Sequence, residues 1–214
     1  MNPYIFILIF VAVLALAIFV WYQAIKASQR SGKIRREMLA KMDRFNALSN
    51  RYQTLIKDEL GAMDNADLFD VAVIRIWKKL GTAEEEMANF EALSSEEKQI
   101  YTAWYIREEV ANDGFASYFR NCVTLKELSV NVLETLGLST LDSIVKRACE
   151  MFDENSSVSC DKQSIAVIDS EFKAAYNFDE YCAAAANYIR ANSDFFVDGD
   201  DALVEMGEVD GENE

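Results

Sequence analysis

Two pairs of adjacent carboxylates, Glu108-Glu109 and Asp153-Glu154, are the residues of this sequence that acid–base or metal chemistry would call on. Neighbouring positions on a helix point in different directions, so neither pair would present both carboxylates to one substrate. The sequence has no His, which removes the commonest general base, the usual partner of a nucleophilic Ser or Cys, and the commonest metal ligand. There is also no phosphate-binding loop of the form G-x-x-x-x-G-K-S/T. We therefore expect a non-catalytic protein without a metal or a cofactor.

Four cysteines are the remaining reactive side chains: Cys122, Cys149, Cys160 and Cys182. None of them forms a C-x-x-C pair, so zinc-ribbon and thioredoxin-like sites lack their signature. We expect buried free thiols, because a free Cys behaves as a small hydrophobic residue. If the domain were exported, the even number could instead mean two disulfides.

The densest group of unusual residues runs from residue 109 to residue 121. Gly114 can adopt the left-handed conformation that ends a helix, and Asn112 or Asp113 can satisfy backbone groups at that break. Three aromatic residues follow at the spacing i, i+3 and i+4: Phe115, Tyr118 and Phe119. This spacing places the three rings on one helical face and predicts an aromatic wedge in the core.

Eight residues of this group match a motif of the form E-V-x-N-G-G-F-x-Q-Y-F-x-N: Glu109, Val110, Asn112, Gly114, Phe115, Tyr118, Phe119 and Asn121. With this motif the chain resembles the DNA-mimic-protein-like domain family, formerly a domain of unknown function, and the resemblance covers roughly residues 85 to 196. Two places depart from the motif, since Asp113 replaces the first Gly and Ser117 replaces Gln. The resemblance implies a shared fold, in which we expect the motif residues to be structural.

For function the resemblance implies a possible role as a mimic of DNA. The family takes its name from a member whose surface carboxylates imitate duplex DNA and occupy a transcription factor. A mimic needs carboxylates arrayed like phosphates, one charge per ~1.7 Å of duplex axis. Acidic surfaces also arise simply for solubility.

The charges of the chain fall into three blocks. Residues 1–25 carry none, the segment from Lys26 to Lys57 carries +7, and the remainder carries −22. A domain with such an excess of carboxylates repels phosphates, so we expect no direct binding to nucleic acid. We expect instead a protein partner with a basic surface.

The N-terminal block predicts a transmembrane anchor over residues 1–25. Tyr4 to Ile25 contains no charged side chain, and a helix of that length rises roughly 33 Å, enough for a hydrocarbon core of ~30 Å. Trp21 and Tyr22 suit an interfacial aromatic belt, and the basic residues follow them. We therefore expect residues 1–36 to contact membrane lipid, with the N-terminus outside and the domain on the cytoplasmic side of an inner or plasma membrane. A cleaved signal peptide would need a basic start and a polar mature N-terminus, which this sequence lacks.

The rest of the chain predicts an all-α protein in three parts. Residues 26–60 form a basic juxtamembrane stalk whose amphipathic helix runs from Ile34 to Leu60, and which either dimerises or docks on its own domain. Residues 61–196 form the helical domain, and residues 197–214 a disordered acidic tail. Capping signals predict these domain helices: Asp64–Leu80, one after Thr82, one after Ser94, Phe115–Asn121, Thr124–Leu136, Leu141–Phe152, Ile165–Tyr176 and Asp179–Ala191. A polar loop is expected over Asn155–Ser164.

The sequence thus favours a membrane-tethered, non-catalytic acidic module that binds a protein partner in the cytoplasm. The alternative is a DNA mimic that occupies a basic DNA-binding protein at the membrane. A second alternative is an exported domain with disulfides, which would place the basic segment on the unfavoured side of the membrane.

Overall fold

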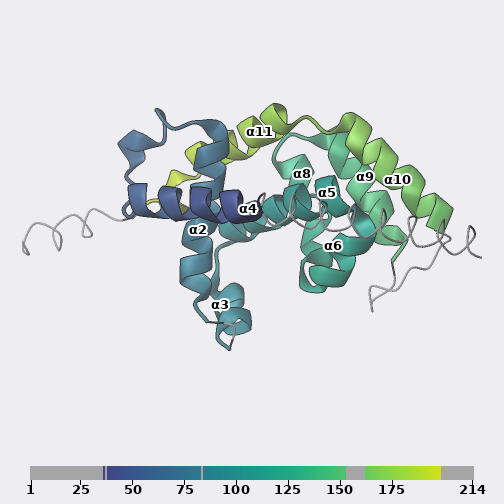
Figure 1. The fold of residues 1–214 in the computed structure, drawn as a ribbon, viewed down its shortest axis with the longest axis horizontal. Coiled ribbons are helices and arrows are strands. Elements are labelled where there is room, and N and C mark those ends of the chain that lie inside the picture. Colours follow the sequence, from purple (N-terminus) through teal and green to yellow (C-terminus); the bar gives the residue numbers. More distant parts are fainter. Residues whose placement is uncertain (1–35, 37, 83, 153–161, 199–214) are drawn as a thin grey trace, which may run out of the picture. The chain divides into compact units, whose positions relative to one another are not determined.

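The computed structural model describes residues 36, 38–82, 84–152 and 162–198. Every regular element in these residues is a helix, which confirms the predicted all-α class for the described part of the chain (Figure 1). The chain divides into two compact units, residues 1–47 and 48–214. The predicted span, Tyr4 to Ile25, lies outside the described residues. Within the described residues, no helix is both long enough and apolar enough to cross a membrane.

The predicted stalk helix ends earlier than expected. The helix over residues 38–51 stops before Leu60, and a short 3-10 helix, η1 (Lys57–Glu59), follows it. The reason is a pairing with the far end of the domain, because Leu55 N–H donates to the Asp198 carboxylate and Asp198 N–H donates to Leu55 O, both at 2.9 Å. Arg75 forms an ion pair with the same carboxylate. The compact unit therefore begins at Leu48, and Asp198, expected in the disordered tail, belongs to the fold.

Helix α2 (Asn65–Leu80) is the centre of this unit. Its predicted start is confirmed, since the Asp64 side chain accepts hydrogen bonds from Ala66 N and Asp67 N. Most of its side chains are buried, including Leu68, Phe69 and Ile76, as expected of a helix with neighbours on several sides. It packs against α11 (Phe178–Ala191) and α4 (Ser95–Tyr105).

Helix α3 (Glu86–Ala92) contacts α2 but contributes no buried residue, and Figure 1 shows it standing out at the end of α2. The capping box predicted from Thr82 and Glu85 forms only in part. The Thr82 N–H and hydroxyl both donate to the Glu85 carboxylate, at 3.3 and 3.0 Å. Within the described residues, the reciprocal bond from a backbone N–H of α3 to the Thr82 hydroxyl does not form.

The chain from α4 to α6 carries the motif. The capping box predicted from Ser94 and Glu97 is present at the start of α4. Helix α4 continues into one wide turn of π-helix, η2 (Ile106–Val110), then into α5 (Ala111–Asp113), which ends at Gly114. Helix α6 (Phe115–Asn121) has the predicted bounds.

The single helix predicted over Thr124–Leu136 is wrong. The structure has η3 (Val123–Leu125), α7 (Lys126–Ser129) and α8 (Val132–Thr135), broken at Asn131, whose φ is +74°. The buried Ser129 hydroxyl bonds to Leu125 O at 2.7 Å and to the Tyr118 hydroxyl at 2.6 Å. The break then turns Val132 and Leu133 into the core, where both are buried.

Helices α9 and α10 lie against each other, and α10 also contacts α6. Helix α9 (Ser139–Glu150) starts and ends two residues before the predicted bounds, Leu141 and Phe152. Its N-cap residue is Leu138, whose side chain makes no capping hydrogen bond. Helix α10 (Lys162–Ala175) includes the last residues of the predicted 155–164 loop. The helix predicted over Asp179–Ala191 is present as α11 and is capped by Asn177, whose side chain accepts from Asp179 N and Glu180 N. The 3-10 helix η4 (Ser193–Phe195) follows it.

Candidate functional site

The polar residues of the motif hold the break between α5 and α6 in place. The Glu109 carboxylate accepts from Asn121 Nδ2 at 3.0 Å and from Ser117 Oγ at 3.3 Å, so the first and last motif residues meet across the turn. Asn112 Nδ2 donates to Glu108 O at 2.6 Å, as one of the predicted ways to satisfy the break. The side chains of Glu109, Ser117 and Asn121 thus bond to one another, and that of Asn112 bonds to the backbone.

Gly114 is required at this break for two reasons. Its φ is +84°, a conformation that side chains rarely adopt, and a Cβ at this position would lie within 2.7 Å of the Asp169 carboxylate. That carboxylate, on α10, accepts from Phe115 N–H at 2.9 Å and so caps α6. Sequence reasoning missed Asp169, because its partner is 54 positions away and no local pattern marks it.

The other motif residues lie in the core. Phe115, Tyr118 and Phe119 are fully buried, and Val110 is nearly so. The Phe115 ring lies edge-on to Phe172 on α10, with 5.5 Å between the ring centroids. Burial raises the pKa of Tyr118 well above its usual range, so its hydroxyl stays neutral. None of these rings is available at the surface to stack on a ligand.

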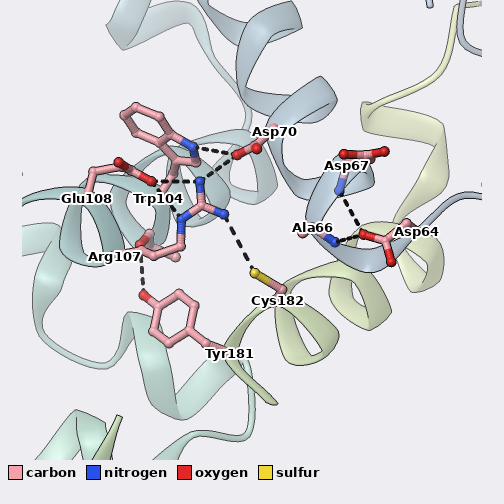
Figure 2. A network of polar contacts seen from close by, with 10 residues as sticks. Asp64, Ala66, Asp67, Asp70, Trp104, Arg107, Glu108, Tyr181 and Cys182 are labelled. Carbon is pink, nitrogen blue, oxygen red and sulfur yellow. Dashed lines mark hydrogen bonds and ion pairs between the residues drawn. The ribbon is translucent and has the colours of Figure 1, made fainter. Parts of the chain in front are cut away.

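A buried ion-pair cluster is centred on Arg107, two positions before the first motif residue (Figure 2). The guanidinium of Arg107, on η2, donates to the Asp70 carboxylate of α2 and, through Nε at 2.9 Å, to Glu108. The Asp70 carboxylate also accepts from Trp104 Nε1 at 3.0 Å, and Arg107 Nη1 lies 3.6 Å from the Cys182 sulfur. The Arg107 side chain is only 5% exposed. The cluster therefore joins α2, α4, η2 and α11 through one cation.

Electrostatics keeps this cation charged. Burial alone would lower the pKa of Arg107, but the carboxylates of Asp70 and Glu108 raise it. The guanidinium also lies over the Phe69 ring, 4.8 Å from its centroid, a favourable arrangement for a cation. Sequence reasoning did not find the cluster, since Asp70 and Arg107 are 37 positions apart.

The adjacent carboxylates Glu108 and Glu109 point to different partners, as expected of neighbouring positions on a helix. Glu108 pairs with Arg107, whereas Glu109 turns to Ser117 and Asn121. The other candidate pair, Asp153-Glu154, lies outside the described residues. Within the described part of the chain, no group of three His, Cys, Asp or Glu residues is placed to hold a metal ion.

Three of the four cysteines are free and buried: Cys122, Cys149 and Cys182. Burial raises the pKa of Cys122 to about 12 and that of Cys149 to about 11. Thiols with such values remain protonated at neutral pH and are poor nucleophiles. Cys160 lies outside the described residues.

The exposed charges of the compact unit are unbalanced. Among its described residues, 14 acidic side chains are exposed: Asp58, Glu59, Asp64, Glu84, Glu85, Glu86, Glu91, Asp113, Glu127, Glu134, Glu150, Asp179, Glu180 and Asp194. Seven basic ones are exposed: Arg51, Lys57, Lys78, Lys79, Arg120, Arg147 and Lys173. Among the described residues of this unit, exposed carboxylates therefore outnumber exposed basic side chains two to one.

The comparison with known families agrees with the motif. Residues 91–192, from the end of α3 to the end of α11, match the family described as DMP19-like protein. This range lies within the one expected from the sequence resemblance and contains the whole motif. No curated protein and no solved structure matches the chain. From α4 to α11, this chain is therefore a DMP19-like domain.

Proposed function

We propose that this chain is a non-catalytic acidic module that binds the basic surface of a DNA-binding protein and competes there with DNA. The observation that carries the proposal is the pairing of a DMP19-like domain with a surface on which exposed carboxylates outnumber exposed basic groups two to one among the described residues. The basic surface of a DNA-binding protein attracts the negative phosphates of DNA, and carboxylates carry charge of the same sign.

The interior of the domain supports an interaction role over catalysis. Arg107, Asp70 and Glu108 satisfy one another, and the motif residues close a backbone turn. The strongly raised pKa values of Tyr118 and Cys122 are due chiefly to burial and not to a neighbouring catalytic group.

We further propose that residues 1–36 tether the module to a membrane, with the domain on the cytoplasmic side. The uncharged run from Tyr4 to Ile25 and the basic residues after it support this arrangement. On the cytoplasmic side of an inner or plasma membrane, DNA-binding proteins are within reach. A tethered module would then hold its partner at the membrane as well as away from DNA.

The test uses the full chain in phosphatidylcholine nanodiscs as bait for basic proteins from its own cells. Proteins retained at about 50 mM salt and released by 20-base-pair duplex DNA are purified singly and tested again, because exposed charge attraction is screened over ~10 Å at 0.1 M. We expect each true partner to bind either the module or labelled duplex in mobility-shift assays. A partner that binds both at once would contradict the proposal.

A further inference from the structure

Helix α3 forms one wall of a groove of about 350 Å³ that η3 and α4 complete. Phe90, Tyr101 and Leu125 supply apolar surface, and Glu86, Met87 and Glu91 complete the α3 side. We call this the α3 groove. Its volume suits one or two inserted side chains of a protein partner, the usual anchors of an interface.

The apolar surface at the α3 groove is uncovered. Met87 is 71% exposed, the largest value among the exposed hydrophobic side chains of the described residues, and no residue of α3 is buried. Val123, on η3 next to the groove residue Thr124, is also exposed. Flexible Met side chains are common at surfaces that accept apolar groups of varied shape.

The charge around the groove is mostly negative. Glu86 and Glu91 line the groove, and Glu84 and Glu85 directly precede α3; all four are exposed, and we call them the acidic rim. Lys98 is the basic residue at this place, but its ammonium donates to Glu91 O at 2.9 Å and lies 5.6 Å from the Phe90 ring centroid. Lys98 thus secures the end of α3, and its ammonium also lies 3.9 Å from the carboxylate of Glu91, which is itself largely exposed.

We propose that the α3 groove docks an amphipathic basic helix of the protein partner, with an apolar side chain inserted beside Met87 and Lys or Arg side chains facing the acidic rim. Amphipathic helices bind in such grooves through apolar side chains at positions i, i+3, i+4 and i+7. A second copy of this chain fits less well, because it would bring two acidic rims together.

This inference rests on the proposed function and adds to it a defined surface and a defined partner chemistry. Residues 86–90 of α3 precede the family match, which starts at residue 91. Glu86, Met87 and Phe90, which form most of the α3 wall, therefore lie outside the matched range, whereas Tyr101, Thr124 and Leu125 lie inside it.

The probe is a fluorescein-labelled 18-residue peptide of Leu and Lys whose Leu residues follow the helical spacing. Its control has the same composition in scrambled order, so both peptides carry the same charge. Binding to the full chain in phosphatidylcholine nanodiscs is followed by fluorescence anisotropy, with empty nanodiscs subtracted. We expect the patterned peptide to bind at least ten-fold more tightly than the scrambled one. Equal affinities of the two peptides would overturn the proposal that the α3 groove binds an amphipathic helix.

Matched variants locate the binding. Met87→Gln should weaken the patterned peptide at least five-fold, whereas Met38→Gln, at a Met that is 65% exposed on the helix over residues 38–51, should not. Glu86→Gln should weaken it about two-fold at low salt, and Glu150→Gln, on α9, should leave it unchanged. An unaltered affinity of Met87→Gln would overturn the proposal.

Two further outcomes separate this inference from the function beneath it. If partners are displaced by DNA from wild type and from Met87→Gln alike, the proposed function stands and the groove is wrong. If the peptide binds at Met87 but no partner is displaced by DNA, the groove stands as a site for a basic helix and the mimicry is wrong. A concentration-dependent dimer by light scattering, lost in Met87→Gln, would assign the groove to a second copy and overturn the proposal.

Discussion

Around Arg107, two carboxylates, an indole and a thiol surround one buried cation, whereas on and just before α3 four glutamates are exposed, two of them lining an apolar groove. The first region joins four helices. The second region contributes no buried residue to the fold. Charge inside this domain therefore serves its stability, and charge outside it is free to serve recognition.

The largest expected effect comes from breaking the buried ion pair. Asp70→Asn leaves the Arg107 guanidinium with one fewer carboxylate in a buried site, and losing one partner of such a pair costs about 3–5 kcal/mol. Urea unfolding of the full chain in nanodiscs, followed by circular dichroism at 222 nm, should show this loss. Arg147→Gln, whose pair with Glu171 is largely exposed, should cost less than about 1 kcal/mol. Equal effects of the two variants would remove the distinction between interior and surface charge.

Gly114→Ala should be the next most damaging change. The backbone conformation there is one that Gly alone adopts readily, which costs about 1–3 kcal/mol for another residue, and the new Cβ would meet Asp169. Gly137→Ala is the matched control, because φ is also positive there, at +82°, but no atom lies within 4 Å of the added Cβ. A smaller loss of stability in Gly137→Ala would show that the ψ of 174° and the Asp169 contact at Gly114 add to the cost of a positive φ. Equal losses would mean that the positive φ alone requires Gly at both positions.

Alkaline pH should weaken the interior without help from mutation. Burial raises the pKa of Cys122 to about 12, of Cys149 to about 11 and of Tyr176 to about 12. The unfolded chain therefore releases these protons at lower pH than the folded chain does, so this contribution to stability is complete below about pH 9 and is lost between pH 9 and 12. The urea midpoint should fall over this range, and less steeply in a Cys122→Ala, Cys149→Ala double variant. A wild-type midpoint that is constant from pH 8 to pH 11 would contradict this.

The smallest effect is expected on α3. Met87→Gln exchanges one exposed side chain for another, and substitutions of this kind usually change stability by less than about 0.5 kcal/mol. The urea midpoint should match that of wild type even though peptide binding is weakened. A large loss of stability would show that α3 is part of the core. The binding test would then use the Glu86→Gln variant in place of Met87→Gln.

Local signals were enough to predict much of the fold. Asp64, Ser94 and Asn177 each cap the helix that the sequence placed after them, because a cap depends on residues two or three positions away. The bounds of α6 follow from Gly114 and the aromatic spacing. The family resemblance was readable from the motif for the same reason, since its residues lie close together in the sequence.

Contacts between distant residues account for what was missed. The break at Asn131 lies beside the Ser129 bond to Tyr118, and the chain after the 38–51 helix pairs with Asp198 through Leu55. Asp169 and the Asp70–Arg107 pair have no local signature. The α3 groove was also missed, because its exposed Met87 is ordinary in the sequence and becomes notable only when the structure shows that nothing covers it.

Competition with DNA tests the central claim most directly. A purified partner is bound to the full chain in nanodiscs at about 50 mM salt and titrated with duplex DNA while release is followed by anisotropy. The account predicts complete displacement, with a midpoint that rises in proportion to the concentration of the module. A ternary complex of module, partner and DNA, or release by salt but never by DNA, would contradict it.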